Sequence, residues 1–145
     1  MIQIEQLTEV TDGVVAALDR LIPQLSSRLP CPSKTDLEAV LVCPCTQVFV
    51  AWNDDEIVGT LVLVSYRALT GEIHSVIEGV VVDKAFRSRG IGEALVRRAQ
   101  AAVREAGGSG ALLTCAPSRE AANQLYRRLG FHQVPTNVFL WLESG

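Results

Sequence analysis

The sequence has no long apolar run and little net charge, and each shortage excludes a class of protein. Its longest uninterrupted apolar runs are about five residues, whereas a membrane-spanning helix needs about 18. No basic stretch followed by an apolar one stands at the N-terminus, so no secretion signal is expected. A formal net charge of only −3 with 48% apolar residues excludes a mainly disordered chain. We therefore expect a soluble cytoplasmic protein with no membrane partner, folded as one domain over residues 1–145.

The residues of a metal site are also lacking. The only histidines are His74 and His132, and the four cysteines form no C-x-x-C pair. A zinc ion held by Cys31, Cys43 and Cys45 would need a distant fourth ligand. We expect no metal, and thiols that are reduced and mostly buried.

Charge is distributed unevenly along the chain. Residues 1–72 carry four Lys or Arg against ten Asp or Glu, and residues 73–145 carry nine against six. An acidic chain without a basic stripe is a poor candidate for nucleic-acid binding. The basic half suits a smaller polyanion such as a phosphate-bearing cofactor. The alternative is that both halves are ordinary solvated surface.

Hydrophobic periodicity and capping residues predict an α/β chain with one mixed, mostly antiparallel sheet flanked by helices. The expected helices cover residues 11–25, 33–42, 90–106 and 117–129. The expected strands cover residues 2–7, 48–52, 57–66, 75–82, 111–115, 131–134 and 138–142. Within the fourth of these strands, Glu78 followed by Gly79 marks a β-bulge or a close backbone approach.

The most informative segment is the turn between the strand at 75–82 and the helix that follows it. Its glycines, Gly90 and Gly92, let the backbone approach a phosphate, and Arg87 and Arg89 add positive charge. The N–H groups of the first helical turn and the helix dipole attract the same anion. Two familiar phosphate motifs are absent, because no Lys-Ser/Thr follows Gly92 and Leu95 stands where a dinucleotide fingerprint needs Gly or Ala.

This segment resembles the signature of the GNAT superfamily of acetyl-CoA-dependent N-acetyltransferases. The family pattern Gln/Arg-x-x-Gly-x-Gly/Ala is filled by Arg87, Gly90 and Gly92. Downstream, Tyr126 and Gly130 stand in a Leu-Tyr-x-x-x-Gly-Phe pattern at the spacing that the family keeps. The likeness covers residues 45–143, and the order of elements in residues 1–44 fits the family's variable N-terminal part. It implies a GNAT fold over the whole chain.

The resemblance also implies how acetyl-CoA binds. The pantetheine arm pairs with the strand like an added strand, and the pyrophosphate rests on backbone amides of the turn. The cofactor-binding residues implied in this way are Val80, Val81, Val82, Arg87, Ser88, Arg89, Gly90, Ile91, Gly92, Glu93 and Asn123. In many relatives an Asn stands seven residues before the Tyr. Here that position is Arg119, and Asn123, one turn later, is the expected substitute.

Two residues are the candidates for acid–base chemistry. The resemblance gives Tyr126 the role of protonating the departing thiolate, and the alternative is an ordinary core tyrosine. Glu78 would hold or deprotonate the amine, and its alternative is a carboxylate at the cleft rim paired with an arginine. His74 is a second candidate base. We interpret Cys115 as a packed thiol and not as an acyl carrier, because no activating base is evident beside it.

The implied activity is transfer of the acetyl group of acetyl-CoA to a primary amine by direct attack in a ternary complex. The alternative is a catalytically silent GNAT-fold module that binds acyl-CoA as a sensor or partner domain. The expected acceptor is a small-molecule or peptide amine. Because exposed closing strands often pair in this superfamily, a homodimer is also expected.

Overall fold

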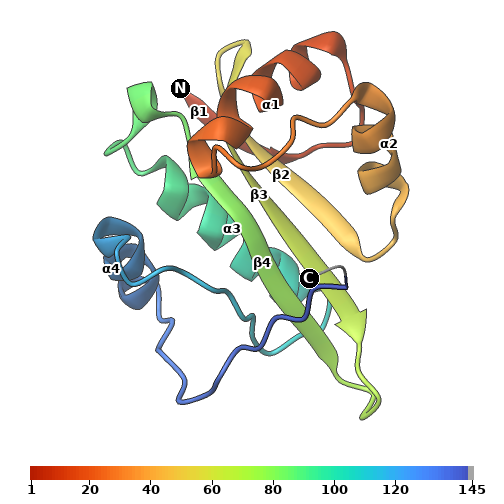
Figure 1. Ribbon diagram of the computed structural model, residues 1–145, viewed down its shortest axis with the longest axis vertical. Helices are drawn as coiled ribbons and strands as arrows, with labels where there is room; N and C mark the ends of the chain where they lie inside the picture. Colours follow the sequence, from red (N-terminus) through yellow and green to blue (C-terminus); the bar gives the residue numbers. More distant parts are fainter. Residues whose placement is uncertain (144–145) are drawn as a thin grey trace. The chain divides into compact units, whose positions relative to one another are not determined.

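The computed structural model describes residues 1–143, and its chain forms two compact units, Met1–Thr114 and a second one that begins at Cys115. The first contains an antiparallel four-stranded sheet in the order β1-β2-β3-β4 (Figure 1). Its strands are β1 (Ile2–Gln6), β2 (Thr46–Asn53), β3 (Glu56–Arg67) and β4 (Ile73–Val82). Within its described residues, 115–143, the second unit contains one helix, α4 (Glu120–Arg128). Among residues 1–143, no helix is both long and apolar enough to cross a bilayer.

Two helices begin at the capping residues that the sequence predicts. Helix α1 (Asp12–Leu25) starts after Thr11, whose Oγ1 accepts a hydrogen bond of 3.2 Å from the Val14 N–H. Helix α2 (Lys34–Val42) starts with a capping box in which the Ser33 hydroxyl and the Asp36 carboxylate accept from each other's backbone N–H. Each cap satisfies donors that a helix start leaves without intrahelical partners. The predicted starts of these helices are therefore confirmed.

The two faces of the sheet are covered by different helices. Val48 and Val50 of β2 share a core with the buried side chains of α1 and with Leu37 of α2. The residue between them, Phe49, points to the other face, where Arg98 of α3 (Ile91–Glu105) lies over its ring at 4.8 Å. Because β2 is buried on both faces, its sequence is a continuous apolar run and not an alternating one.

Strand β4 contains the β-bulge that the sequence predicts. In its register with β3, Glu78 pairs with Val62 and Val81 pairs with Thr60, so two residues of β4 oppose Leu61 alone. The extra residue is accommodated by Gly79, whose φ is +61°. A bulge bends its strand and interrupts the pairing at that point. The bulge therefore separates the first part of β4 from its last three residues.

Three predicted strands are wrong. Instead of a strand over 111–115, the first unit has a single parallel bridge between Leu112 and Val76. The next parallel pairing would fall at Glu78, where the bulge interrupts the strand. Residues 131–134 and 138–142 form no strand, neither with each other nor with another described segment. The confirmed part of the fold prediction is the mostly antiparallel sheet flanked by helices.

The expectation of mostly buried thiols is also wrong. Cys31, Cys43 and Cys45 are exposed and Cys115 is half-buried, and all four are free. The first three lie in the loop before α2 and in the connection from α2 to β2, which run over the surface. Loop positions leave a small side chain accessible whatever its polarity. Within residues 1–143, no three His, Cys, Asp or Glu side chains lie close enough together to hold a metal ion.

Candidate functional site

The turn after β4 is built by one buried carboxylate and two residues in the left-handed region. Asp83 follows the strand, and its Oδ1 accepts a hydrogen bond of 3.1 Å from the Ala85 N–H, which starts a single 3-10 turn, η1 (Lys84–Phe86). Beyond η1, Ser88 has φ +65° and Gly90 has φ +79°. A left-handed serine is uncommon and costs energy that its surroundings must offset. The sequence pattern predicts the glycine at this turn but not the left-handed serine.

Helix α3 begins at this turn, at a residue that has no side chain to cap it. Gly90 is the N-cap and forms no side-chain capping bond. A Cβ on Gly90 would meet nothing within 4 Å, so its positive φ, and not a lack of space, is what favours glycine there. The N–H groups of Ile91 and Gly92 belong to the first helical turn, where the helix dipole favours an anion. The turn therefore has the backbone chemistry of a phosphate site.

Two arginines flank this helix start, and both are exposed. Arg87 donates from Nε to the Val82 carbonyl oxygen at 3.1 Å. Arg89 lies over the Phe86 ring at 5.0 Å. The first contact uses only Nε and the second only the flat face of the guanidinium, so both leave guanidinium N–H groups for other acceptors. Glu93, the acidic residue of the first turn, lies 3.4 Å from the Nε of Arg97 on the next turn.

At the end of β4, one side of the strand pairs with β3, and the backbone groups on the opposite side do not. The Asp83 N–H donates to the Val58 carbonyl at 2.8 Å, so Asp83 faces β3. Because successive residues of a strand direct their backbone groups to opposite sides, Val82 faces the other way. Within residues 1–114, pairing on that side of β4 is limited to the bridge at Val76. Backbone groups of Val80 and the N–H of Val82 are thus placed for an extended, amide-bearing ligand, while Val81 directs its backbone groups to β3.

Glu78 lies on the face of the sheet that α1 covers. Its partner in register is Val62, which packs against the core cluster of α1 and α2. The neighbouring Gly79 lies near the end of α1, because a Cβ there would be 3.9 Å from Leu25 Cδ2. The Glu78 side chain is exposed and makes no ion pair within residues 1–143. The carboxylate is thus free to meet a ligand on that face.

The second candidate base lies at the opposite end of β4. His74 is exposed, its Nε2 is 3.7 Å from Glu72 Oε2, and its ring meets the Tyr66 ring edge to face at 5.7 Å. It lies by the β3–β4 hairpin, eight residues before Val82. Of the two candidate bases, only Glu78 adjoins the bulge.

In the second unit, Tyr126 is the buried residue of helix α4. Burial raises the pKa of its phenol, the Cys115 thiol adds to the rise, and Arg119 opposes it. The hydroxyl therefore keeps its proton beyond the usual pH range of a tyrosine. The predicted inward partners Ala122, Leu125 and Leu129 are half-buried.

Asn123 holds the start of α4. Its Nδ2 lies 2.9 Å from the Ala116 carbonyl oxygen, 2.8 Å from that of Arg119 and 3.5 Å from Cys115 Sγ. These contacts use the donors of the amide, so a contact with acetyl-CoA would fall to Oδ1, which only accepts. Arg119, where many relatives have Asn, is the N-cap of α4 and forms no side-chain cap.

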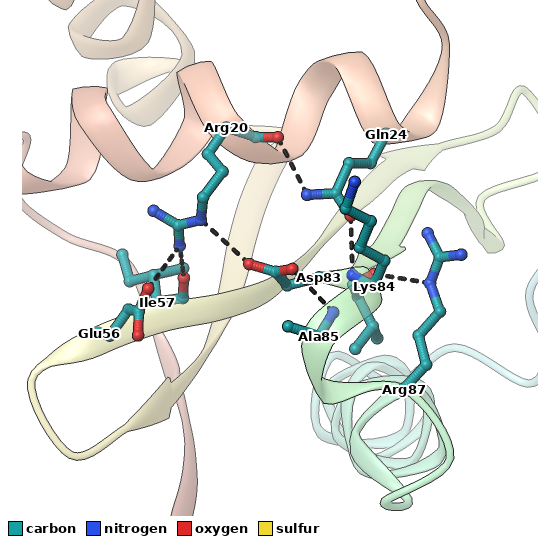
Figure 2. A network of polar contacts seen from close by, with 9 residues as sticks. Arg20, Gln24, Glu56, Ile57, Asp83, Lys84, Ala85 and Arg87 are labelled. Carbon is teal, nitrogen blue, oxygen red and sulfur yellow. Dashed lines mark hydrogen bonds and ion pairs between the residues drawn. The ribbon is translucent and has the colours of Figure 1, made fainter.

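A network of polar contacts that the sequence does not predict connects helix α1 to the turn (Figure 2). Arg20 of α1 donates from Nε to Asp83 Oδ2 at 3.0 Å, and its Nη2 donates to the Ile57 carbonyl oxygen. Gln24, one turn later, accepts from the Lys84 N–H at 2.8 Å. A signal was present, because Arg20 interrupts a helix face on which Ala17 and Leu21 are buried. A cation at the border of a buried face needs a partner.

Comparison with known proteins gives a family and a fold. The model of the acetyltransferase (GNAT) family matches residues 16–131. A search of curated protein sequences finds no match.

Among solved structures, an aminoglycoside acetyltransferase from an uncultured soil metagenomic sample, in complex with trehalose, is 21% identical with a TM-score of 0.84, over 98% of this chain and 97% of that chain. AAC(6')-Iy in complex with the bisubstrate analog CoA-S-monomethyl-acetylneamine is 19% identical with a TM-score of 0.81, over 99% of both chains. A ribosomal-protein-alanine N-acetyltransferase from Brucella melitensis biovar Abortus 2308 is 19% identical with a TM-score of 0.78, over 99% of this chain and 100% of that chain.

At these identities the three structures show the shared fold, which confirms the predicted one. The family match spans most of the chain and includes the bulged strand, the turn and α3. The protein therefore belongs to the acetyltransferase (GNAT) family.

Proposed function

We propose that this protein transfers the acetyl group of acetyl-CoA to a primary amine by direct attack in a ternary complex. The observation that carries the proposal is the uncapped start of α3, which follows a turn with two positive φ angles directly after the bulged strand. The backbone N–H groups of this turn suit a diphosphate, and the open edge of β4 suits the amides of a pantetheine arm. Acetyl-CoA contains both groups and supplies an activated thioester.

Several residues of the turn and strand would hold acetyl-CoA. The diphosphate would contact backbone N–H groups from Arg87 through Glu93, with the side chains of Arg87 and Arg89 beside it. Backbone groups of Val80 and Val82, on either side of Val81, would pair with the pantetheine arm. One backbone N–H of this strand would donate to the thioester oxygen as negative charge develops on it. Asn123 remains a candidate contact through Oδ1 alone.

Proton transfer is the second task, because amines are mostly protonated at neutral pH. We assign removal of this proton to Glu78, directly or through an ordered water, because its carboxylate is exposed and adjoins the bulge. We assign protonation of the leaving sulfur to Tyr126, because its buried phenol has a raised pKa and is protonated at neutral pH. Positioning of the two substrates supplies much of the remaining rate.

We further propose that the acceptor is a small molecule with several amino groups. One structural relative is named an aminoglycoside acetyltransferase, and AAC(6')-Iy was solved with a bisubstrate analog that joins CoA to acetylneamine, which supports this class. The acidic residues that predominate in residues 1–72 would favour a cationic acceptor. A peptide amine is the other class to include in the test.

The test is a thiol-release assay with acetyl-CoA and a panel of acceptors that includes aminoglycosides, simple diamines and lysine peptides. CoA release that depends on the added amine is the expected result. Binding of acetyl-CoA without release for any amine would contradict the proposed transfer and indicate a module that only binds acyl-CoA. Failure to bind acetyl-CoA would contradict the assigned turn itself.

A further inference from the structure

Arg20 connects helix α1 to the turn that would bind acetyl-CoA, although 63 residues separate it from Asp83. Its guanidinium makes three contacts, which are 3.0 Å from Nε to Asp83 Oδ2, 2.6 Å from Nη2 to the Ile57 carbonyl oxygen, and 3.4 Å from Nη2 to Glu56 Oε1. The contacted residues lie at the start of β3 and directly after β4, so Arg20 joins these two segments to α1 (Figure 2). Arginine suits this position because its planar fork carries several fixed donors.

Asp83 is the partner that shapes the turn. Its side chain is only 9% exposed, and its two carboxylate oxygens have different tasks. Oδ1 accepts from the Ala85 N–H and starts η1, while Oδ2 accepts from Arg20. A buried carboxylate without its counter-charge is strongly unfavourable. The ion pair with Arg20 therefore stabilises the position of the Asp83 carboxylate that starts the turn.

Gln24 provides a second tie one helical turn later. Its Oε1 accepts from the Lys84 N–H at 2.8 Å, and its Nε2 donates to the Arg20 carbonyl oxygen at 3.2 Å. Because two residues of the same helix, Arg20 and Gln24, contact neighbouring residues of this segment, they fix the direction of residues 83–85 as well as their position. The segment leads within five residues to Gly90 and the start of α3.

We propose that Arg20 and Asp83 are a positioning pair that keeps the acetyl-CoA-binding turn in its binding conformation before acetyl-CoA arrives. This inference rests on the function proposed above. The turn needs such support because it contains the left-handed Ser88 as well as Gly90. A turn that is already rigid loses less conformational entropy when acetyl-CoA binds, so less of the binding free energy is needed to order it. Neither residue of the pair is assigned a contact with acetyl-CoA, so the pair acts through the turn.

The inference predicts a specific kinetic pattern. Arg20→Gln and Asp83→Asn should each raise the KM and Kd for acetyl-CoA about fivefold to tenfold, because part of the binding free energy is spent on ordering the turn. The kcat at saturating acetyl-CoA should stay within about twofold, since the ordered turn is the same once occupied. Arg20→Lys should restore part of the affinity, because lysine keeps the charge but has no fork to reach Asp83 and Ile57 together.

Two variants serve as controls. Glu56→Gln removes the other carboxylate that contacts Arg20 and leaves the pair with Asp83 intact. Thr11→Ala removes the side-chain cap of α1 and destabilises that helix without touching the turn. Both should leave the KM for acetyl-CoA unchanged, which separates positioning of the turn from general loss of stability.

Three results would overturn the inference. They are an unchanged KM in both Arg20→Gln and Asp83→Asn, an equal rise in Thr11→Ala, or a fall in kcat without a change in KM. Should Arg20→Gln not fold, Arg20→Lys must show an intermediate rise in KM, and a wild-type value there would contradict the pair. If the unchanged protein itself binds no acetyl-CoA, the proposed function fails along with the pair.

Discussion

The rings of Tyr126 and Phe131 meet edge to face, with their centroids 5.9 Å apart and their planes at 66°. This contact packs the phenol ring against Phe131 and does not involve the Tyr126 hydroxyl. A tyrosine placed in this way can lose its oxygen without losing its packing. Removal of the hydroxyl alone therefore tests the chemistry of Tyr126 without disturbing the fold.

Tyr126→Phe should lower kcat by about 10²–10⁴-fold, the usual contribution of a positioned general acid. The affinity for acetyl-CoA should stay unchanged, because the ring remains packed on Phe131. Thiol release and calorimetry on the same preparation measure the two quantities. Phe131→Leu is the matched control, which loses the ring contact and keeps the hydroxyl, and it should retain most of its turnover. Equal rates in Tyr126→Phe and the wild type would remove Tyr126 from the mechanism.

The dependence of rate on pH gives a separate test of the same residue. Because burial raises the pKa of Tyr126, the phenol should stay protonated up to and beyond the usual tyrosine pKa of about 10. The rate should therefore show no alkaline decline from Tyr126 below that pH. A decline centred near about pH 8 that disappears in Tyr126→Phe would show that the pKa is lowered and not raised.

Gly90→Glu should abolish acetyl-CoA binding, because it places a negative side chain at the uncapped start of α3. Calorimetric titration with acetyl-CoA measures the loss, and circular dichroism checks the fold. Gly90→Asn is the control, since asparagine tolerates a positive φ better than other side chains and carries no charge. A folded Gly90→Glu variant with wild-type affinity would show that the phosphates do not bind at this turn.

Glu78→Gln should lower kcat/KM for the amine by about 10²-fold or more and leave acetyl-CoA affinity unchanged. The glutamine keeps the size of the side chain and cannot accept the amine's proton. His74→Gln, at the other end of β4, should leave both quantities unchanged. Initial rates with each substrate varied in turn separate the two effects. The reverse pattern, with His74→Gln inactive, would move the base to the hairpin end of the strand.

Asp83→Asn should destabilise the protein at neutral pH and have less effect in acid. The Ala85 N–H and Arg20 both lower the pKa of Asp83, so its folded-state pKa lies below the unfolded value of about 3.9. A lowered pKa adds stability that is fully present above the unfolded value and is lost as pH falls through the folded one. Urea unfolding of both proteins should show that the difference in their free energies of unfolding is smaller at about pH 3 than at about pH 7. An equal difference in free energy of unfolding at both pH values would mean that the charge of Asp83 is not what stabilises the fold.

The sequence predicted those parts of the fold that local chemistry determines. Thr11 and Ser33 start their helices because their hydroxyls accept backbone hydrogen bonds, and such caps can be recognised from sequence. The bulge was likewise predictable, because a carboxylate followed by glycine does not fit a regular buried strand. The turn with Gly90 and the apolar face of α3 follow from the same local rules.

The wrong predictions concern features that depend on distant partners. A strand over 111–115 needs a regular neighbouring edge, and β4 provides one only as far as its bulge. The apolar residues at 138–142 indicated a strand, but in the described residues they remain mostly exposed. The position of Arg20 on a buried helix face indicates that it needs a partner, but no sequence pattern relates it to Asp83, so only the structure identifies that partner. For Glu78 and Tyr126 the structure gives surroundings that fit the predicted roles, and the roles themselves stay predictions.

The extra residue in β4 has a consequence for how this strand can change over generations. In a regular strand Ile77 and Val81 would point the same way, yet Val81 belongs to the core beneath α1, while Ile77 pairs with Leu63 outside that core. One residue more or fewer would therefore turn one of them, with its neighbours, toward the wrong layer. Insertions and deletions should accumulate instead at the hairpin tip, where Leu69 is fully exposed. The length of β4 is thus as constrained as its composition.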